Sequence, residues 1–296
     1  MDLFLPSLGF GLVTASIIAL AAVGFTLQFG VTNIINLAYG DVMTASAMVA
    51  YICNNGAGLN IWLCLPIGAA FGALASLALN RGVFVPFIRH GASLLTIVIV
   101  TLACALIIQN LLLAIWGPNF FSYSMSSGRS VDALSMTFTV AQLAIMGISL
   151  AAMFAIHLLL TFSKLGKAMR ATASNAALAR SCGIRTERII DLTWLISGAL
   201  CGLSGVVLVI NTTSFTAGTG AGFLLVIAAA AILGGIGRPY GAMAGALVIG
   251  ISTEVSAAYI NPSYKDVVAF GILVVVLLIR PQGILPGSTS EKGVTT

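Results

Sequence analysis

Long apolar stretches alternate with short polar segments along the whole chain. An α-helix rises ~1.5 Å per residue, so about 20 apolar residues cross a hydrocarbon core of ~30 Å. We therefore expect an all-α polytopic membrane protein that forms a single membrane domain over residues 1–296. The expected membrane segments, about nine in number, are residues 8–28, 33–52, 61–80, 94–115, 138–162, 190–210, 222–234, 241–260 and 266–280.

One polar segment is longer and more basic than the others. Residues 163–189 contain six basic side chains and one acid, which is too much charge for lipid and too little apolar surface for a separate fold. We expect this segment to be a cytoplasmic loop. Inside it, Ser174 or Asn175 can cap a short helix that Gly183 ends in a left-handed conformation, and Thr186 can cap the next helix.

This short helix carries a small apolar face, formed by Ala176, Ala177, Leu178 and Ala179. A helix of about eight residues is marginal in water, and a groove on a partner protein would stabilise it. The alternative is a solvated basic loop that lies against lipid headgroups. Both interpretations stay open at this point.

The basic residues divide unevenly between the two sides of the membrane. With nine crossings, eleven of the 13 Lys and Arg residues lie on one side, and only Arg129 and Lys265 lie on the other. Cytoplasmic loops are enriched in Lys and Arg, so we expect the N-terminus outside and the C-terminus in the cytoplasm. A re-entrant 222–234 segment would instead divide them nine against four. These loops and membrane lipid account for the net charge of +5 without nucleic acid.

Glycines predict close helix packing and two breaks in the helices. Four pairs have the four-residue spacing that lets helices approach in lipid, namely Gly68 and Gly72, Gly198 and Gly202, Gly218 and Gly222, and Gly241 and Gly245. Two further segments, FGVTNIINLAYGDVM and LGGIGRPYGAMAG, predict irregular or tightly turned backbone near membrane depth. Such backbone is tolerated where protein surrounds it or where it lines a wet cavity.

Polar side chains within the apolar stretches are candidates for a solute pathway. Asn33, Asn36, Asp41 and Glu254 are the ones we single out. Asp41 could instead cap a helix that begins at Val42. Glu254 lies roughly 20 Å from the cytoplasmic end of its helix, where it would line a pathway, pair with another group or lie at the interface. The remaining polar candidates are Gln28, Gln109, Asn110, His157 and Asp191.

Composition argues against most enzymatic functions. The chain is 59% hydrophobic and 7% charged, whereas soluble domains contain roughly 25% charged residues. No G-x-x-x-x-G-K-[ST] loop is present to bind nucleotide phosphates. Gly202-Leu203-Ser204-Gly205 matches a motif of intramembrane serine proteases, but no histidine follows it to act as the base. We expect no catalytic residues, no metal and no cofactor bound by this chain.

Four segments carry a family resemblance: GVTNIINLAYGDVMTASAMVAY, GKAMRATASNAALARSCGIRTERI, LGGIGRPYGAMAGALVIG and SYKDVVAFGILVVVLLIRPQGILPG. In this order they resemble the permeases of ABC importers for branched-chain (hydrophobic) amino acids, and the chain is similar to the H-type member of the pair. The second segment resembles the coupling loop of such permeases. The likeness runs from Gly11 to Gly287.

The resemblance implies an importer in the bacterial cytoplasmic (inner) membrane. Two permease chains, usually a heterodimer of homologues, would work with two cytoplasmic ATPase subunits and a periplasmic or lipid-anchored substrate-binding protein. The partner ATPases would use the ATP. The run Leu37 to Asp41 adds Tyr39 to the candidate pathway residues. The residues implied in ATPase coupling are Arg170, Ser174, Asn175, Ala177, Leu178, Arg180 and Gly183.

The solute stays open within this family. Branched-chain or other hydrophobic amino acids are the leading expectation, but urea, short amides and aromatic acids have importers of the same type. The chain departs from its relatives at Tyr39 and Asp41, where a Phe-Ala-His-Gly-Glu-like run is common, and at Ser174 and Asn175, where acids are common. A stand-alone channel or secondary transporter would leave residues 163–189 unexplained. A receptor or membrane enzyme would need a chromophore lysine, metal ligands or an acid–base pair at depth.

Overall fold

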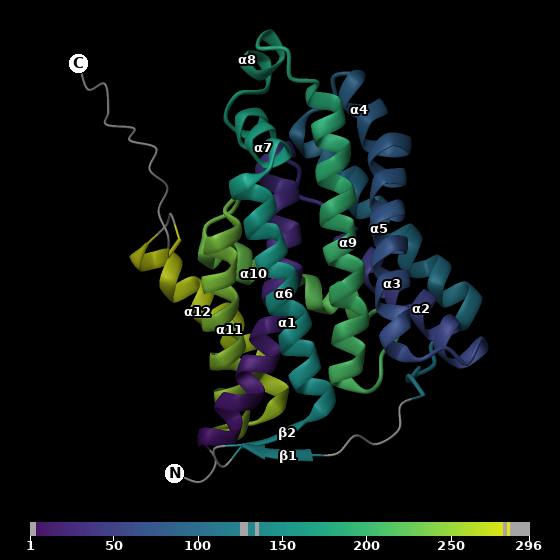
Figure 1. Ribbon diagram of the computed structural model, residues 1–296, viewed down its shortest axis with the longest axis vertical. Coiled ribbons are helices and arrows are strands. Elements are labelled where there is room, and N and C mark those ends of the chain that lie inside the picture. Colours follow the sequence, from purple (N-terminus) through teal and green to yellow (C-terminus); the bar gives the residue numbers. More distant parts are fainter. Residues whose placement is uncertain (1–3, 125–129, 134–135, 281–282, 285–296) are drawn as a thin grey trace.

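The computed structural model describes residues 4–124, 130–133, 136–280 and 283–284, and the membrane part is helical (Figure 1). A two-stranded antiparallel hairpin, β1 (Ser130–Ala133) and β2 (Met136–Thr139), lies between α5 and α6. Short turns of other helix types are η1 (Ile52–Gly56), η2 (Asn80–Phe84) and η3 (Pro262–Tyr264). The α-helices are α1 (Phe4–Thr32), α2 (Tyr39–Tyr51), α3 (Ile61–Leu79), α4 (Val85–Arg89), α5 (Leu94–Trp116), α6 (Val140–Phe162), α7 (Lys164–Ser174), α8 (Ala176–Ser181), α9 (Thr186–Thr212), α10 (Thr219–Gly234), α11 (Pro239–Tyr259) and α12 (Lys265–Ile279).

Among the described residues, 6 helical runs are long and apolar enough to cross a membrane: α1, the continuous run Ile61–Arg89, α5, α6, α9 and α11. An apolar helix is present at each of the other three expected positions, but α2, α10 and α12 have only 13, 16 and 15 residues. At ~1.5 Å per residue they are shorter than a ~30 Å hydrocarbon core. Residues 33–38 are not helical, so the expectation of a helix over the whole of 33–52 is wrong, whereas the irregular backbone expected within FGVTNIINLAYGDVM is present.

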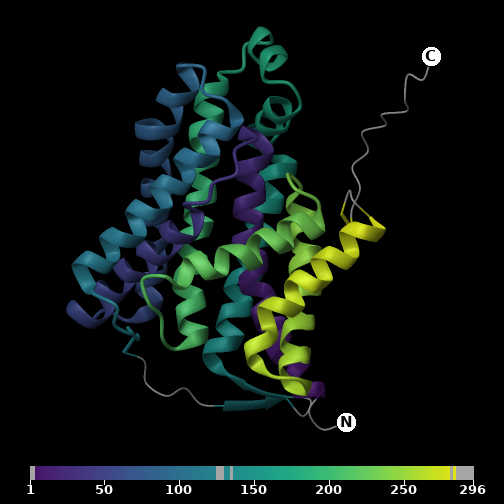
Figure 2. The ribbon, with the colours of Figure 1, turned by 180° about the vertical axis from the view of Figure 1, so that it is seen from behind.

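The two ends of the bundle differ in chemistry (Figure 1). One end carries α4, α7, α8 and the start of α9, together with most of the described Lys and Arg residues, and we call it the basic end. The other end carries the β1–β2 hairpin, and we call it the hairpin end. Helix α1 runs from the hairpin end to the basic end, and α9 runs in the opposite direction (Figures 1 and 2).

The chain contains two halves with matching local geometry. Residues Asn33 and Thr213 follow the long helices α1 and α9, and both have a positive φ, 55° and 63°, which no other described residue except glycine shows. A short non-helical segment follows in each case, and the next helices begin at Tyr39 and Thr219. Residue 33 thus matches 213 and residue 39 matches 219, a constant difference of 180. The two segments share one backbone design.

Hydrogen bonds repeat at the same spacing. The Tyr39 amide donates to the Asn36 carbonyl at 3.3 Å, and the Thr219 amide donates to the Thr216 carbonyl at 3.1 Å. In both halves a threonine hydroxyl in the last turn of the long helix donates to the carbonyl four residues earlier. Since α1 and α9 run in opposite directions, the two halves form an inverted repeat, an arrangement that recurs in membrane transporters.

The short helices α2 and α10 cross where they begin. A Cβ added to Gly40 would overlap the Gly220 carbonyl oxygen, and a Cβ added to Gly220 would overlap the Gly40 carbonyl oxygen. This mutual contact is what a twofold axis between the halves would produce. The Gly220 amide also donates to the Thr44 hydroxyl at 2.8 Å. Only glycine permits backbones to approach this closely.

Each half packs one of its helices along the long first helix of the other half. Helix α3 of the first half packs along α9, and α11 of the second half packs along α1. Gly72 faces Gly198 and Gly202 where α3 meets α9, and Gly241 faces Gly234 where α11 follows α10. Close packing is therefore confirmed for three of the four expected glycine pairs. It is wrong for Gly218 and Gly222, because Gly222 has open space around it in the described part of the chain.

The second predicted break is a tight turn. Helix α10 ends at Gly234 and α11 begins at Pro239. Between them Gly235 and Gly237 have φ values of 103° and 84°, which side chains rarely tolerate. Proline at the start of α11 fits because the first helical amide has no partner to lose.

Candidate functional site

Helices α7 and α8 lie together at the basic end of the bundle (Figure 1). The Asn175 side chain accepts a hydrogen bond from the Leu178 amide at 3.0 Å, so Asn175 caps α8. Ser174 is instead the last residue of α7. Gly183 follows α8 with φ of 84°, and the Ile184 amide then donates to the Ala179 carbonyl at 3.0 Å. This left-handed end is the one that the sequence predicts.

The face of α8 that points away from the bundle is open. Leu178 has an exposed fraction of 62%, whereas Ala179 is buried against the rest of the chain at 5%. Ala177 and Arg180 are also exposed. An exposed leucine at the tip of a six-residue helix provides apolar surface for a partner.

Helix α7 fixes this pair of helices to the membrane part. The Arg170 guanidinium donates to the Leu160 carbonyl near the end of α6, where helical carbonyls lack partners and favour a cation. Gly166 lies so close to the backbone at Leu160 that a side chain would not fit. Arg170 is thus an internal anchor of the segment, in contrast to the outward-facing Leu178.

The expected cap at Thr186 is wrong. Thr186 is the first residue of α9 and is only 2% exposed, while Arg185 occupies the cap position without a side-chain hydrogen bond. A capping side chain must precede the first turn to accept hydrogen bonds from its free amides, and Thr186 is already part of that turn. Its side chain is buried against the bundle instead.

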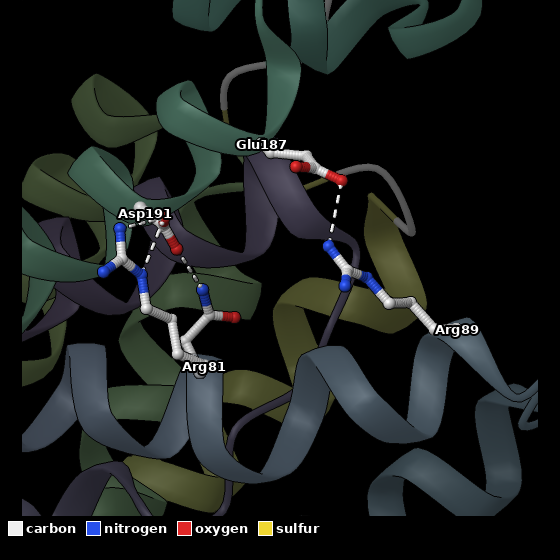
Figure 3. Close-up of polar contacts among 5 residues, drawn as sticks. Arg81, Arg89, Glu187 and Asp191 are labelled. Carbon is white, nitrogen blue, oxygen red and sulfur yellow. Dashed lines mark hydrogen bonds and ion pairs between the residues drawn. The ribbon is translucent and has the colours of Figure 1, made fainter.

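Two sets of ionic contacts join the start of α9 to the run from α3 to α4 (Figure 3). Asp191 accepts hydrogen bonds from Arg81 Nε at 3.0 Å, from Arg81 Nη2 at 2.8 Å and from Asn80 Nδ2 at 2.9 Å. Glu187 accepts one from Arg89 at 3.2 Å, with both side chains largely exposed. These contacts connect the start of α9 directly to the first half of the chain.

The interior candidates cluster around the break between α1 and α2. Asn33 is exposed, whereas Asn36 and Asp41 are 1% and 2% exposed. Asn36 Oδ1 accepts from the Ala38 amide at 3.1 Å, and its buried Nδ2 has no partner among the described residues. Tyr39 is completely buried, and its hydroxyl donates to the Ala21 carbonyl at 3.0 Å.

Asp41 does not act as a helix cap. Helix α2 begins at Tyr39 instead of Val42, and Ala38 occupies the cap position. Asp41 lies within the first turn, where the partial positive charge of the helix favours a carboxylate. Its buried Oδ1 has no hydrogen-bond partner in the described part of the chain. A buried polar atom without a hydrogen bond lowers the stability of the fold, so its presence here calls for a functional explanation.

Glu254 borders a cavity of about 340 Å³ toward the hairpin end. Its carboxylate accepts a hydrogen bond from the Thr14 hydroxyl at 3.0 Å and pairs with the Lys265 ammonium at 2.7 Å. The side chain of Glu254 is 16% exposed and that of Lys265 is 38% exposed. Sequence reasoning missed Lys265 and Thr14, because these residues come from other helices and no local spacing links them to Glu254.

The candidate residues thus fall into three places. Asn36, Tyr39 and Asp41 lie together at the crossing of α2 and α10, Glu254 lies by the cavity, and the coupling residues lie at the basic end. Among the described residues, no three His, Cys, Asp or Glu side chains come close enough together to hold a metal ion. This arrangement offers surfaces for binding and movement.

An inverted repeat of broken helices, with a capped helix exposed at one end, defines a multi-pass membrane transport protein. A family model described as branched-chain amino acid transport system / permease component matches residues 7–277. The chain belongs to this family. Its members are permease subunits of ABC transport systems and are not themselves catalytic.

Known relatives of the chain agree with this assignment. The chain is 32% identical to the high-affinity branched-chain amino acid transport system permease protein LivH of Escherichia coli K12, over 98% of this chain and 97% of the relative. It is 32% identical to BraD of Pseudomonas aeruginosa, over 98% of each chain. LivM of E. coli K12 is 26% identical over 89% of this chain and 66% of the relative.

A solved structure shares the fold. PsaBC from Streptococcus pneumoniae in complex with Fab superposes with a TM-score of 0.51, at 16% identity, over 92% of this chain and 91% of that one. At this identity the likeness concerns the fold alone.

Proposed function

We propose that this chain is one of two permease subunits of an ATP-driven importer for branched-chain or other hydrophobic amino acids. The observation that carries the proposal is the exposed helix α8, capped by Asn175, ended by Gly183 and presenting Leu178 to a partner. A groove on an ATPase subunit would cover its apolar face.

The basic end then faces the cytoplasm, with the N-terminus outside and the protein in the bacterial inner membrane. The charge distribution supports this orientation, since α7, α8 and the start of α9 hold most of the described basic residues. The partners in this proposal are a second, homologous permease chain, two ATPase subunits that use the ATP, and a substrate-binding protein on the outer side.

The proposed coupling route passes from α8 to α9. Only the turn at Gly183 separates these helices, and Asp191 ties α9 to Arg81 of the first half. A movement of α8 imposed by the ATPases would shift α9, together with α3, against α1 and α11. The two inverted halves supply the two packings that alternating access requires.

Asn36 and Asp41 are assigned to the proposed solute pathway because each has a buried polar atom without a hydrogen-bond partner among the described residues. These atoms lie at the α2–α10 crossing, and a passing polar solute would satisfy them. Tyr39 is enclosed by protein and contributes to packing through Phe25.

Reconstitution tests the proposed function. Proteoliposomes that contain this chain, its homologous permease and two ATPase subunits should accumulate L-leucine only with ATP and the binding protein present. Exposed Leu178→Asp on α8 should abolish ATP-dependent uptake while leaving the chain inserted. Leucine uptake by this chain alone, without ATP, would contradict the proposal.

A further inference from the structure

We infer that the cavity beside Glu254 binds a zwitterionic amino acid with an aliphatic side chain, an inference that rests on the proposed function. The cavity opens between α1, α9, α10, α11 and α12 and measures about 340 Å³. This volume lies within the range of roughly 300–1,000 Å³ that is usual for small-ligand sites.

The cavity provides charges of both signs. Glu254 and Asp266 offer carboxylates for an ammonium group, and Lys265 offers an ammonium for a carboxylate. Glu254 and Lys265 pair with each other at 2.7 Å. A zwitterion can replace this pair with two new pairs, so no charge is left alone when the ligand enters or leaves.

The remaining walls suit an aliphatic side chain. Apolar side chains from three helices face the cavity, and they include Ile17, Ile18, Leu208, Phe223 and Val226. An amino acid could therefore place its charged end at Glu254 and Lys265 and its side chain against these residues. Each buried methylene adds favourable apolar contact, so these walls favour leucine over glycine or alanine.

The inverted repeat places different side chains at the positions that match the lining of the cavity. Trp194 stands at the position of the other half that matches Thr14, and Phe84 stands at the position that matches Tyr264. These two rings are fully buried, with centroids 5.1 Å apart. The same positions in the first half also carry Leu74 and Val85 where the second half carries Glu254 and Lys265.

This comparison indicates that the fold itself does not require a cavity at this place. The backbone design can be packed with large aromatic side chains, as the Trp194–Phe84 pair demonstrates. At the cavity, Thr14 of the first half is small and leaves room, and its hydroxyl donates a hydrogen bond to the Glu254 carboxylate of the second half. An ion pair that served only to join α11 and α12 would not need the adjacent volume.

Equilibrium binding to the assembled complex tests the inference. Tritiated L-leucine is measured on the nanodisc complex without the binding protein, with 4-methylpentanoate and 3-methylbutylamine as competitors. We expect saturable leucine binding, against which each competitor, lacking one of the two charges, is at least ten-fold weaker. Glu254→Gln and Lys265→Met should each weaken leucine binding at least ten-fold.

A filling variant keeps the test independent of charge. Thr14→Trp introduces the side chain of its counterpart in the second half, Trp194, and should abolish leucine binding. The exposed Thr161→Trp is the matched control and should bind leucine as the unaltered complex does. Wild-type leucine affinity in a folded Thr14→Trp complex would overturn the inference. So would Glu254→Gln and Lys265→Met variants that melt earlier but bind leucine normally, since the pair would then be structural.

The same preparations distinguish the two proposals. ATP-driven leucine uptake by a complex that shows no saturable leucine binding would overturn the cavity assignment and leave the importer function in place. Failure of the complex to assemble or to transport any amino acid would overturn the importer function itself.

Discussion

Gly40 and Gly220 place their backbones in direct contact, each carbonyl oxygen occupying the space where a Cβ of the other would lie. This contact is where α2 and α10 cross, and it lies between two halves whose residue numbers match at a difference of 180. The crossing is thus the pivot about which the inverted halves are arranged.

Alanine at either crossing glycine should destabilise the protein. Gly40→Ala and Gly220→Ala each force a methyl group against backbone that cannot move aside, at a cost of about 1–3 kcal/mol. Thermal unfolding in detergent should show a lower melting temperature for both. Gly222→Ala on the same helix has open space and serves as the control. Equal melting temperatures for all three would contradict the tight crossing.

Gly183 should matter through its backbone conformation alone. Its φ is 84° and no neighbour occupies the space around it, so Gly183→Val strains the left-handed turn by roughly 1–2 kcal/mol without a steric clash. We expect the ATPases to hydrolyse ATP with less leucine transported per ATP. Gly183→Asn should retain most of the coupling, because asparagine tolerates this conformation. Similar uncoupling by Val and Asn would argue against the turn as the cause.

The Arg81–Asp191 contact should contribute little to stability and more to coupling. Arg81 is largely exposed, and solvent screening leaves exposed ion pairs with only a small contribution to stability. A double-mutant cycle with Arg81→Gln and Asp191→Asn should therefore give a small interaction energy in unfolding. In transport the two changes should be non-additive, since both cut the same link between α9 and the first half. Additive effects on transport would remove this link from the coupling route.

Asp41→Asn separates a pathway role from a folding role. The substitution keeps the size of the side chain and removes the charge from a residue that is 2% exposed. If Asp41 serves the solute pathway, ATP-driven uptake should fall by about ten-fold or more, a change of ~1.4 kcal/mol, while the folded yield stays within a factor of two of wild type. Parallel losses of yield and uptake would indicate that Asp41 serves the structure of α2.

Local features were predictable from the sequence, and long-range ones were not. The Asn175 cap and the Gly183 turn follow from residues within one short helix, and the structure has both. The start of α2 at Tyr39 does not follow from hydropathy, because four of the six residues before it are apolar, namely Ile34, Ile35, Leu37 and Ala38. Thr186 was expected as a cap, but tertiary burial placed it inside the helix.

The inverted repeat leaves only a faint signal in the sequence. Thr32 matches Thr212 and Gly40 matches Gly220, while most positions between them differ. Backbone geometry is shared because different residues, here Asn33 and Thr213, can adopt a positive φ and end a helix. Likewise, the Glu254–Lys265 pair forms across the turn between α11 and α12, where helical spacing gives no guide.

A photo-crosslinker in place of Leu178 tests the central claim most directly, because this side chain is the exposed apolar contact of α8. Irradiation of native membranes, followed by mass spectrometry, should yield a covalent adduct with an ATPase subunit. The same group in place of Leu150, which is similarly exposed on α6, should yield none. An adduct with the ATPase from Leu178 would establish α8 as the docking element. Adducts with lipid alone at both positions would contradict the account.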